Sequence, residues 1–380
     1  MIFIAIAILF FLIYACLIIY YRQSWMQIPL YKEQLTNREI SNTLISVIIP
    51  ARNEEGNIGA CLTSVVNQSY PKNLFEIIVV DDFSTDSTAT IINSFSKENV
   101  SLISLKDFVK EGELNSYKKK AIEVAISNAK GALIVTTDAD CIVPHLWLQR
   151  IASFYKRYHP AFIAAPVAYY GETNFLKIFQ TLDFMTLQGI TAASVYKKFH
   201  SMCNGANLAY EKAVFLEVGG FRGIENIASG DDMLLMNKIS DRYPERVLFL
   251  KSPDAIVRTK PANTLQDFFN QRIRWASKAD KYTDKKIIAV LLLVYLFNAW
   301  LLFLGILSIL LPHVFYGFIG VLISKTIIEL FFLYPVARFF NKEKLLWWFP
   351  LAQPLHIIYT VIAGWLGKFG SYKWKERKVK

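Results

Sequence analysis

Asp138 and Asp140 are separated by one residue and directly follow an apolar run at residues 132–137. Two carboxylates at this spacing can approach one ion together, and their oxygens suit a hard divalent cation such as Mg²⁺ or Mn²⁺, which takes diphosphate oxygens as further ligands. Such a cation offsets the charge that develops on a departing diphosphate. An ordinary acidic loop is the alternative, but the position after a strand-like run favours a metal site.

Asp81 and Asp82 end a second apolar run, at residues 76–80. Adjacent carboxylates at the carboxyl end of a strand can accept hydrogen bonds from a ribose or a base. Ser84 and Asp86, which are residue types common in turns, follow this pair, so a loop that caps a helix explains the pair equally well.

Asp231 and Asp232 follow Gly230 and precede the apolar residues 233–236, a pattern that predicts a helix with acids in its first turn. Acids at this position compensate the helix dipole. A carboxylate here can also remove a proton from an acceptor hydroxyl group. The residues alone leave both interpretations open.

Gln271, Arg274 and Trp275 lie at offsets of three and four, so on a helix they share a face. Arginine suits diphosphate oxygens, and the indole offers a flat apolar surface to a sugar ring. A basic amphipathic helix on a bilayer is the alternative, and both can hold at once. The apolar side of that helix would be Leu265, Phe268, Phe269, Ile273 and Ala276, with Arg272, Lys278 and Lys281 toward the head groups.

The elements that position these motifs predict an α/β domain over residues 44–258. The expected strands are residues 45–50, 76–80 and 132–137, and the expected helices are residues 56–66, a helix capped by Asp86, and residues 116–129 with Gly131 past its end. Strands and helices that alternate in this way form a mostly parallel sheet covered by helices. Ligands bind at the carboxyl ends of such strands, which is where the acidic motifs fall.

The remaining segments are apolar enough to enter a membrane. Residues 1–21 carry no charge and are long enough to span a bilayer; a signal peptide is the alternative, but the stretch lacks a basic start and a small-residue cleavage site. Residues 259–286 would form an interfacial segment and residues 287–367 transmembrane or re-entrant helices. The last residues, 368–380, form a basic tail.

Membrane topology is not settled by these patterns. Arg22 and Lys32 follow the first span, which places the α/β domain in the cytoplasm. Three further crossings would put the basic tail outside, against the same tendency. Pro350 and Pro354 break the last apolar run, and this favours a segment that is re-entrant or lies in the interface.

Composition supports a membrane protein and excludes several other classes. Hydrophobic residues make up 53% of the chain and the net charge is +11, so the basic excess is expected to face anionic lipid or phosphate. The sequence carries no nucleic-acid-binding signature. Its 4 cysteines form no CxxC pair and its 5 histidines are scattered, which predicts neither a disulfide framework nor a zinc site.

Taken in order, the motifs resemble those of family 2 glycosyltransferases with the GT-A fold, over residues 46–282. The motifs are SVIIPARNEE (46–55), EIIVVDDFSTDST (76–88), KKKA (118–121), TTDAD (136–140), CNGANLAY (203–210), GDD (230–232) and QRIRW (271–275). The resemblance implies a membrane-bound enzyme whose cytoplasmic domain transfers a hexosyl group from a nucleotide-diphosphate sugar, with inversion and with Mg²⁺ or Mn²⁺.

The resemblance also implies roles for individual residues. The nucleotide pocket would be formed by Pro50, Arg52, Glu54, Asp81, Asp82, Lys120 and Asp138, although three consecutive lysines leave the register at Lys120 ambiguous. Asp138 and Asp140 would hold the cation. Asp232 would be the general base, beside Asp231, which stands where the family usually has Glu. The residues closing over donor and acceptor would be Gln271, Arg274 and Trp275, with Asn204 and Gly205 near the acceptor.

Donor and acceptor stay open within the family. UDP-sugars are its usual donors, and GDP-sugars are not excluded. The few C-terminal membrane segments favour a single transfer to a lipid or lipid-linked glycan over a processive polysaccharide synthase. An inactive membrane scaffold is a remote alternative, against which the intact acids argue, and a transporter would need more spans.

Overall fold

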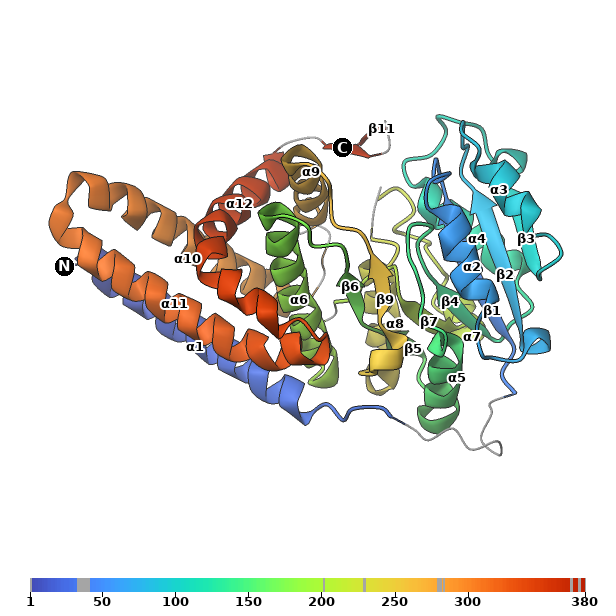
Figure 1. Ribbon diagram of the computed structural model, residues 1–380, viewed down its shortest axis with the longest axis horizontal. Helices are drawn as coiled ribbons and strands as arrows, with labels where there is room; N and C mark the ends of the chain where they lie inside the picture. The colour runs from blue at the N-terminus through green and yellow to red at the C-terminus, as the bar shows by residue number, and fades with distance from the viewer. Residues whose placement is uncertain are drawn as a thin grey trace.

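The computed structural model describes residues 2–32, 42–200, 202–227, 230–278, 282, 284–369, 372–374 and 377–379, the last two ranges as backbone only. An α/β domain occupies one end of the molecule, and long apolar helices extend from it at the other (Figure 1). The expected tail at residues 368–380 and Lys281 lie wholly or mostly outside the described residues.

A seven-stranded sheet forms the centre of the α/β domain, in the order β3-β2-β1-β4-β7-β5-β8. Its strands are β1 (Ile45–Ala51), β2 (Phe75–Asp81), β3 (Val100–Ser104), β4 (Leu133–Thr136), β5 (Phe162–Ala164), β7 (Leu208–Glu211) and β8 (Val247–Phe249). Strands β1 to β4 are parallel, and β7 runs antiparallel to both its neighbours. The mostly parallel sheet confirms the predicted fold class. A smaller parallel pair joins β6 (Val167–Tyr169) to β9 (Val257–Thr259).

The register of the sheet brings the acidic motifs to one edge. Ala51 pairs with Asp81, and Ile48 pairs with Thr136, so β1, β2 and β4 end close together. These strands form because their Val and Ile side chains are buried on both faces of the sheet. Asp82 and Asp138 therefore leave the sheet at the same side.

The helices that cover the sheet are α2 (Ile58–Val66), α3 (Thr88–Ser94), α4 (Tyr117–Asn128), α5 (Trp147–Tyr158), α6 (Phe175–Tyr196), α7 (Lys212–Glu217) and α8 (Met233–Arg242). The helix expected at residues 56–66 is confirmed as α2, and its Ile58, Cys61 and Leu62 side chains are buried. The helix expected to be capped by Asp86 begins later, at Thr88. The Asp86 carboxylate still accepts a hydrogen bond from the backbone N–H of Thr88, at 3.0 Å.

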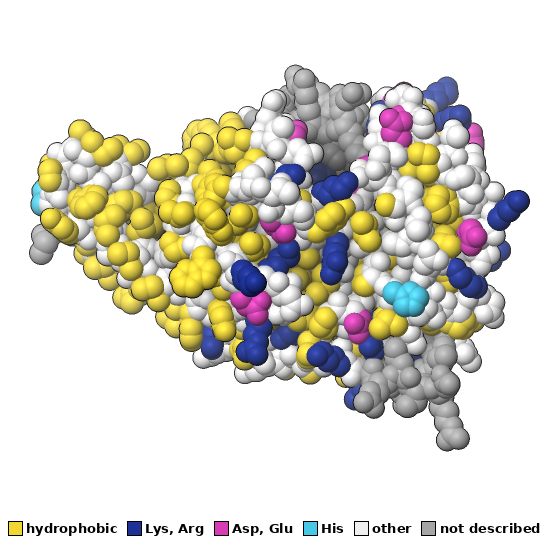
Figure 2. Space-filling view, viewed as in Figure 1, with side chains coloured by type: hydrophobic (Ala, Val, Ile, Leu, Met, Phe, Trp, Pro, Cys, Tyr) yellow, Lys and Arg dark blue, Asp and Glu magenta, His cyan; other side chains and the backbone are white. Residues whose placement is uncertain are grey.

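Helices α1 (Ile2–Gln27), α10 (Lys285–Leu310) and α11 (Pro312–Phe339) pack side by side and extend away from the sheet (Figure 1). The fourth apolar segment comprises the short 3₁₀ helix η6 (Glu343–Trp348) and α12 (Phe349–Phe369), and it packs against α6 and α9 (Leu265–Ala276). All four segments are long and apolar enough to cross a membrane. Apolar side chains dominate this end of the molecular surface, while charged side chains gather toward the sheet (Figure 2).

The two ends of the η6–α12 segment contact α6 and α9. At its start, the ring of Trp348 lies 6.1 Å from that of Phe175, the first residue of α6. At its end, Gly367 packs so closely on α9 that a Cβ atom there would lie 2.6 Å from the Cβ of Ala276.

Lys325 and Glu329, which interrupt an apolar run in the sequence, turn inward between the helices. The Lys325 ammonium lies 2.7 Å from a Glu329 carboxylate oxygen and donates to Gln353 of α12 at 2.8 Å. Tyr14 of α1 donates a hydrogen bond to Glu329. Paired charges of this kind are how a membrane helix accommodates ionisable residues, and here they join three helices.

Lys251 fastens α1 to the α/β domain. Its ammonium donates to the carbonyl oxygens of Trp25, at 2.8 Å, and Ile28, at 3.3 Å, and lies 4.0 Å from the centroid of the Trp25 ring. Burial lowers the pKa of Lys251 to about 8. The backbone N–H of Tyr31 completes the junction by donating to the carbonyl of Lys251 at 2.8 Å.

Gly131 is required by a close backbone approach. The sequence predicts it as the glycine that ends a helix, but the C-cap of α4 is Ala129 in an extended conformation. A Cβ atom at Gly131 would lie 2.4 Å from the backbone nitrogen of Ser46. The Gly131 N–H also donates to the Ser46 hydroxyl, at 2.8 Å.

We expect Gly131→Ala to lower the free energy of unfolding by about 1–3 kcal/mol, because β1 must move to admit the methyl group. Gly56→Ala is the matched control, since nothing lies within 4 Å of a Cβ atom there. Thermal unfolding of the two variants in detergent measures the difference. Equal melting temperatures would contradict the proposed role of Gly131.

Candidate active site

A cavity of about 1380 Å³ begins at the carboxyl edge of the sheet and continues to the membrane helices. Its polar end is lined by Pro50, Arg52, Glu54, Asp82, Lys118, Asp138, Asp140, Asp231 and Asp232. Its apolar wall includes Leu17 and Ile18 of α1, Ile288 and Leu291 of α10, and Trp365 and Phe369 of α12. Every site residue singled out in the sequence lines this cavity except Asp81 and Lys120.

Asp81 and Asp82 make different contacts. The Asp81 carboxylate accepts from the backbone N–H of Ser84, at 3.3 Å, so the loop-capping alternative describes Asp81. Asp82 faces the cavity and lies 3.9 Å from Arg52. The Arg52 guanidinium also donates to the Asp82 carbonyl oxygen at 2.8 Å, which braces the ends of β1 and β2 against each other.

Lys120, which was predicted to reach the nucleotide, does not line the cavity. Residues two apart on a helix point to nearly opposite sides, and Lys120 lies outside the cavity lining, 3.6 Å from Glu123. Lys118 occupies the cavity instead. Lys119 turns inward to the carbonyls of Ile224 and Ile227, and burial lowers its pKa to about 8.

Lys118 bridges two acids that are far apart in the sequence. Its ammonium lies 2.7 Å from Asp138 and 3.0 Å from Asp231. Burial lowers the pKa of Lys118, but the two carboxylates outweigh it and hold that pKa above its ordinary value. For Asp231, burial raises the pKa, whereas Lys118 and Lys278 lower it below the usual range. Both partners therefore stay charged at neutral pH.

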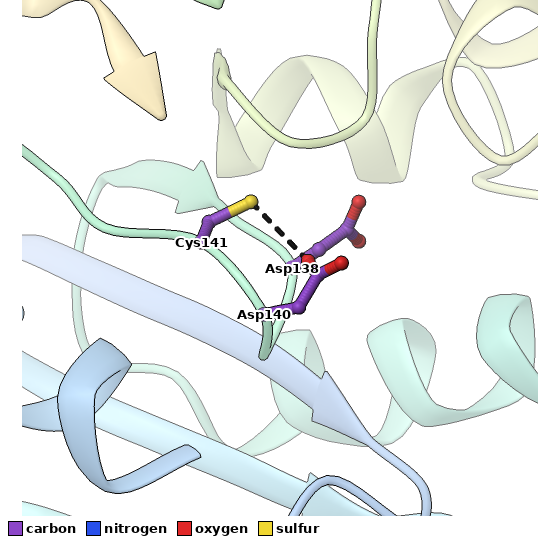
Figure 3. Close-up of side chains that lie close together, drawn as sticks. All are labelled: Asp138, Asp140 and Cys141. Atoms are coloured by element: carbon purple, nitrogen blue, oxygen red, sulfur yellow. Dashed lines mark hydrogen bonds between the residues drawn. The ribbon is translucent and has the colours of Figure 1, made fainter. Parts of the chain in front are cut away.

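Asp138, Asp140 and Cys141 place their ligand atoms within 4.8 Å of one another, and Figure 3 shows the two carboxylates pointing to the same side of the loop. The Cys141 thiol donates to Asp140 at 3.4 Å. Burial, Asp140 and Asp138 raise the pKa of Cys141, so it stays a thiol and does not suit a hard cation. The two carboxylates do suit Mg²⁺ or Mn²⁺.

Asp232 is the N-cap of α8, and its carboxylate is held from two sides. One oxygen accepts from the backbone N–H of Met233, at 2.7 Å, and the other from that of Gly205, at 3.2 Å. Lys278 lies 3.7 Å from the first oxygen. The predicted helix start is thus confirmed, but Asp232 is the N-cap and not a residue of the first turn, and its carboxylate also faces the cavity.

The QRIRW motif lies on α9, and Gln271, Arg274 and Trp275 face the cavity as one side of that helix. Arg272 and Lys278, expected at the lipid head groups, are buried instead. Arg272 lies 2.8 Å from Asp183 of α6, and Lys278 lies beside Asp232. These expectations were wrong because α9 packs on α12 of the same chain.

Sequence reasoning missed Lys118, Lys278 and Asp183. Lys118 was missed because three consecutive lysines left the register of the helix ambiguous. Lys278 was missed because the amphipathic pattern of its segment predicted a surface residue. A signal was available for Asp183, since it is the only acidic residue in the otherwise largely apolar α6. A charge in such a helix marks a functional position by default.

The sheet, the acids at its edge and the adjoining cavity define the GT-A class of glycosyltransferases. The profile of Glycosyl transferase family 2 matches residues 46–219, and that of Glycosyl transferase family group 2 matches residues 133–365. The chain therefore belongs to the family 2 glycosyltransferases, as the motifs indicated.

Two curated relatives and one solved structure agree with this assignment. The chain is 28% identical over 208 residues to Glycosyltransferase AglE of Haloferax volcanii, covering 52% of this chain and 61% of that protein. It is 27% identical over 267 residues to Probable glycosyltransferase YdaM of Bacillus subtilis, covering 69% and 60%. The solved structure is that of mannosyltransferase PcManGT from Pyrobaculum calidifontis in complex with GDP-Man and Mn²⁺. It matches with a TM-score of 0.57 and 18% sequence identity, over 96% of this chain and 99% of that chain. This match shows a shared fold. The chain thus spans about three fifths of the two curated relatives.

We expect Lys118→Met to lower the free energy of unfolding by about 1–3 kcal/mol, because Asp138 and Asp231 lose the cation between them. Lys120→Met is the matched control, since its half-exposed pair with Glu123 contributes little. Melting temperatures of the ligand-free proteins test this, and a larger loss for the Lys120 variant would reverse the assignment of the two lysines.

Proposed function

We propose that this protein transfers a single hexosyl group from a nucleotide-diphosphate sugar to a lipid or lipid-linked acceptor, with inversion, at the cytoplasmic face of a membrane. One observation carries the proposal. The cavity is continuous from the acids at the sheet edge to an apolar wall built by helices long enough to cross a bilayer. Such a cavity suits a soluble charged donor and a membrane-embedded acceptor together.

The donor belongs at the polar end of the cavity. Pro50, Arg52, Glu54, Asp82 and Arg274 line the cavity. The first four would surround the nucleotide, and Arg274 would face the diphosphate. Asp138 and Asp140 would hold Mg²⁺ or Mn²⁺, and that cation, when bound, offsets the charge of the departing diphosphate. The nucleotide is proposed as uridine diphosphate, the usual one in the family, with guanosine diphosphate as the alternative.

Asp232 is the proposed general base. Asp231 is committed to Lys118, whereas two backbone N–H groups orient the Asp232 carboxylate at the cavity. Asp232 takes the proton of an acceptor hydroxyl group, whose oxygen bonds to the anomeric carbon as the bond from that carbon to the diphosphate breaks. A single displacement of this kind inverts the configuration. Asn204, Gly205, Gln271 and Trp275 line the same region and would position the acceptor.

The acceptor enters from the apolar end. Leu17, Ile288, Leu291, Trp365 and Phe369 give that wall the character of a slot for hydrocarbon chains. Four candidate spans are present among the described residues, few for a channel that must carry a growing polymer. We therefore favour single transfer over processive synthesis.

The membrane arrangement follows from the two ends of the last apolar segment. Because Trp348 contacts α6 and Gly367 contacts α9, we propose that α12 stays on the side of the α/β domain, while α1, α10 and α11 cross. Three crossings place the N-terminus outside and residues 370–380 in the cytoplasm, which removes the conflict with the positive-inside tendency.

Reporter fusions or thiol labelling in sealed vesicles test this topology. We expect a cysteine placed after Lys380 to react only when the cytoplasmic side is accessible, and a cysteine before Met1 to react from the opposite side. A tail that is labelled from the outside would show that α12 crosses.

We expect Asp232→Asn to lower the rate of sugar transfer by about 10²–10⁴-fold, because the amide cannot accept the hydroxyl proton. Nucleotide-sugar with Mn²⁺ should still raise the melting temperature, since donor binding does not need this carboxylate. Transfer is measured with labelled donor and membrane lipids as acceptors.

Asp241→Asn is the control, because Asp241 lies exposed at the far end of the same helix α8. Full activity of the Asp232 variant would remove that residue from the role of base. The same assay reports product size, and a ladder of products in place of a single adduct would exclude single transfer.

A further inference from the structure

Four polar side chains form one section of the cavity wall, which we call the polar patch: Asp183 of α6, Arg272 of α9, and His356 and Thr360 of α12. Arg272 lies 2.8 Å from one Asp183 oxygen. The other Asp183 oxygen accepts from the Tyr359 hydroxyl, at 2.5 Å, and lies 3.9 Å from His356. His356 and Thr360 are one helical turn apart and share a face of α12.

The polar patch keeps hydrogen-bonding capacity that the protein itself does not use. Among the described residues, no group in hydrogen-bond geometry meets Arg272 Nε or Nη1, His356 Nδ1 or Thr360 Oγ1, although all these atoms are buried. Arg272 Nη2 and Asp183 Oδ2 contact each other. Arg272 is 4% exposed and Asp183 is 7% exposed. Buried polar groups are normally satisfied, so this concentration in one cavity indicates a ligand.

The patch lies next to the place of transfer. The Arg272 guanidinium lies 4.2 Å from the centroid of the Trp275 ring, and Trp275 and Asp232 line the same cavity. A second ring, that of Phe268, lies 5.0 Å from the same guanidinium. Whatever binds the patch is thus in reach of the acceptor position.

The chemistry of the patch points to one class of ligand. Arg272 donates, Asp183 accepts, and Thr360 and His356 can do either. The formal charges of Arg272 and Asp183 cancel, so the patch offers no net charge to an anion. A phosphate has only acceptors at neutral pH and would lie beside the Asp183 carboxylate, whereas hydroxyl groups both donate and accept.

We infer that the polar patch binds the uncharged, hydroxyl-bearing head group of the acceptor lipid, a glyceryl or glycosyl group, in preference to a lipid phosphate. This inference rests on the proposed transfer to a lipid. It assigns the acceptor hydroxyl group to a neutral lipid and makes Asp183, Arg272, His356 and Thr360 the residues that recognise it.

Thr360→Val provides a sharp test, because it removes the hydroxyl group and keeps the shape of the side chain. The Thr360 hydroxyl lies beside that of Tyr359 but, among the residues that the structure describes, has no partner in good hydrogen-bond geometry, so the melting temperature should change little. We expect the KM for the acceptor lipid to rise by about two- to tenfold, the effect of one lost hydrogen bond, while the KM for the donor stays unchanged.

Thr186→Val is the matched control. Thr186 also lines the cavity, on α6, but its hydroxyl already donates to the Leu182 carbonyl at 2.9 Å. We therefore expect no change in the acceptor KM. An equal rise in both variants, or no rise in the Thr360 variant, would overturn the assignment of the patch.

The acceptor class is tested with the full chain in nanodiscs, with Mn²⁺ and labelled UDP- and GDP-sugars. The acceptor arms are dioleoylglycerol, glucosyl-dioleoylglycerol and undecaprenyl phosphate. We expect transfer to a neutral lipid and none to the phosphate. Transfer to undecaprenyl phosphate alone would overturn this inference and leave the proposed function standing, whereas no transfer and no donor hydrolysis in any arm would overturn both.

Discussion

The ammonium group of Lys118 holds together the acidic segments at the carboxyl edge of the sheet. Lys118 of α4 lies between Asp138, which follows β4, and Asp231, which precedes α8. Without it, carboxylates from two distant segments would face each other in a partly dehydrated cavity and repel. Because Asp232 follows Asp231 directly, the same contact sets the distance between the proposed cation site and the proposed base.

A second buried ion pair relates the membrane helices to this edge. Asp183 of α6 is held by Tyr359 of α12 and contacts Arg272 of α9, whose guanidinium stacks on Trp275. Helix α12 is thus linked through these four residues to the part of the cavity that Trp275 lines. The α/β domain and the apolar helices therefore contribute jointly to one site, and neither contains it alone.

Much of this arrangement was predictable from residue type and spacing. Apolar runs rich in Val and Ile marked β1, β2 and β4, and the acids that follow them marked the site. Strands β5 and β8 have only 3 residues each, too short for a periodic pattern. An amphipathic pattern cannot tell a bilayer from a neighbouring helix, so Arg272 and Lys278 were misplaced. Gly131 was predicted as the glycine that ends a helix, whereas the structure requires a glycine there because the backbone of Ser46 lies so close.

The clamp of Lys251 on the last turn of α1 has a consequence for substrate choice. The hydrogen bonds of Lys251 to the carbonyls of Trp25 and Ile28 fix the position of the end of α1 relative to the α/β domain. In a bilayer, α1 would therefore hold the sheet at a fixed distance from the hydrocarbon layer. The proposed lipid acceptor would then be selected by the depth of its hydroxyl group in the bilayer as well as by the chemistry of that group. Inserting a few residues between α1 and the α/β domain would relax this selection without changing the cavity.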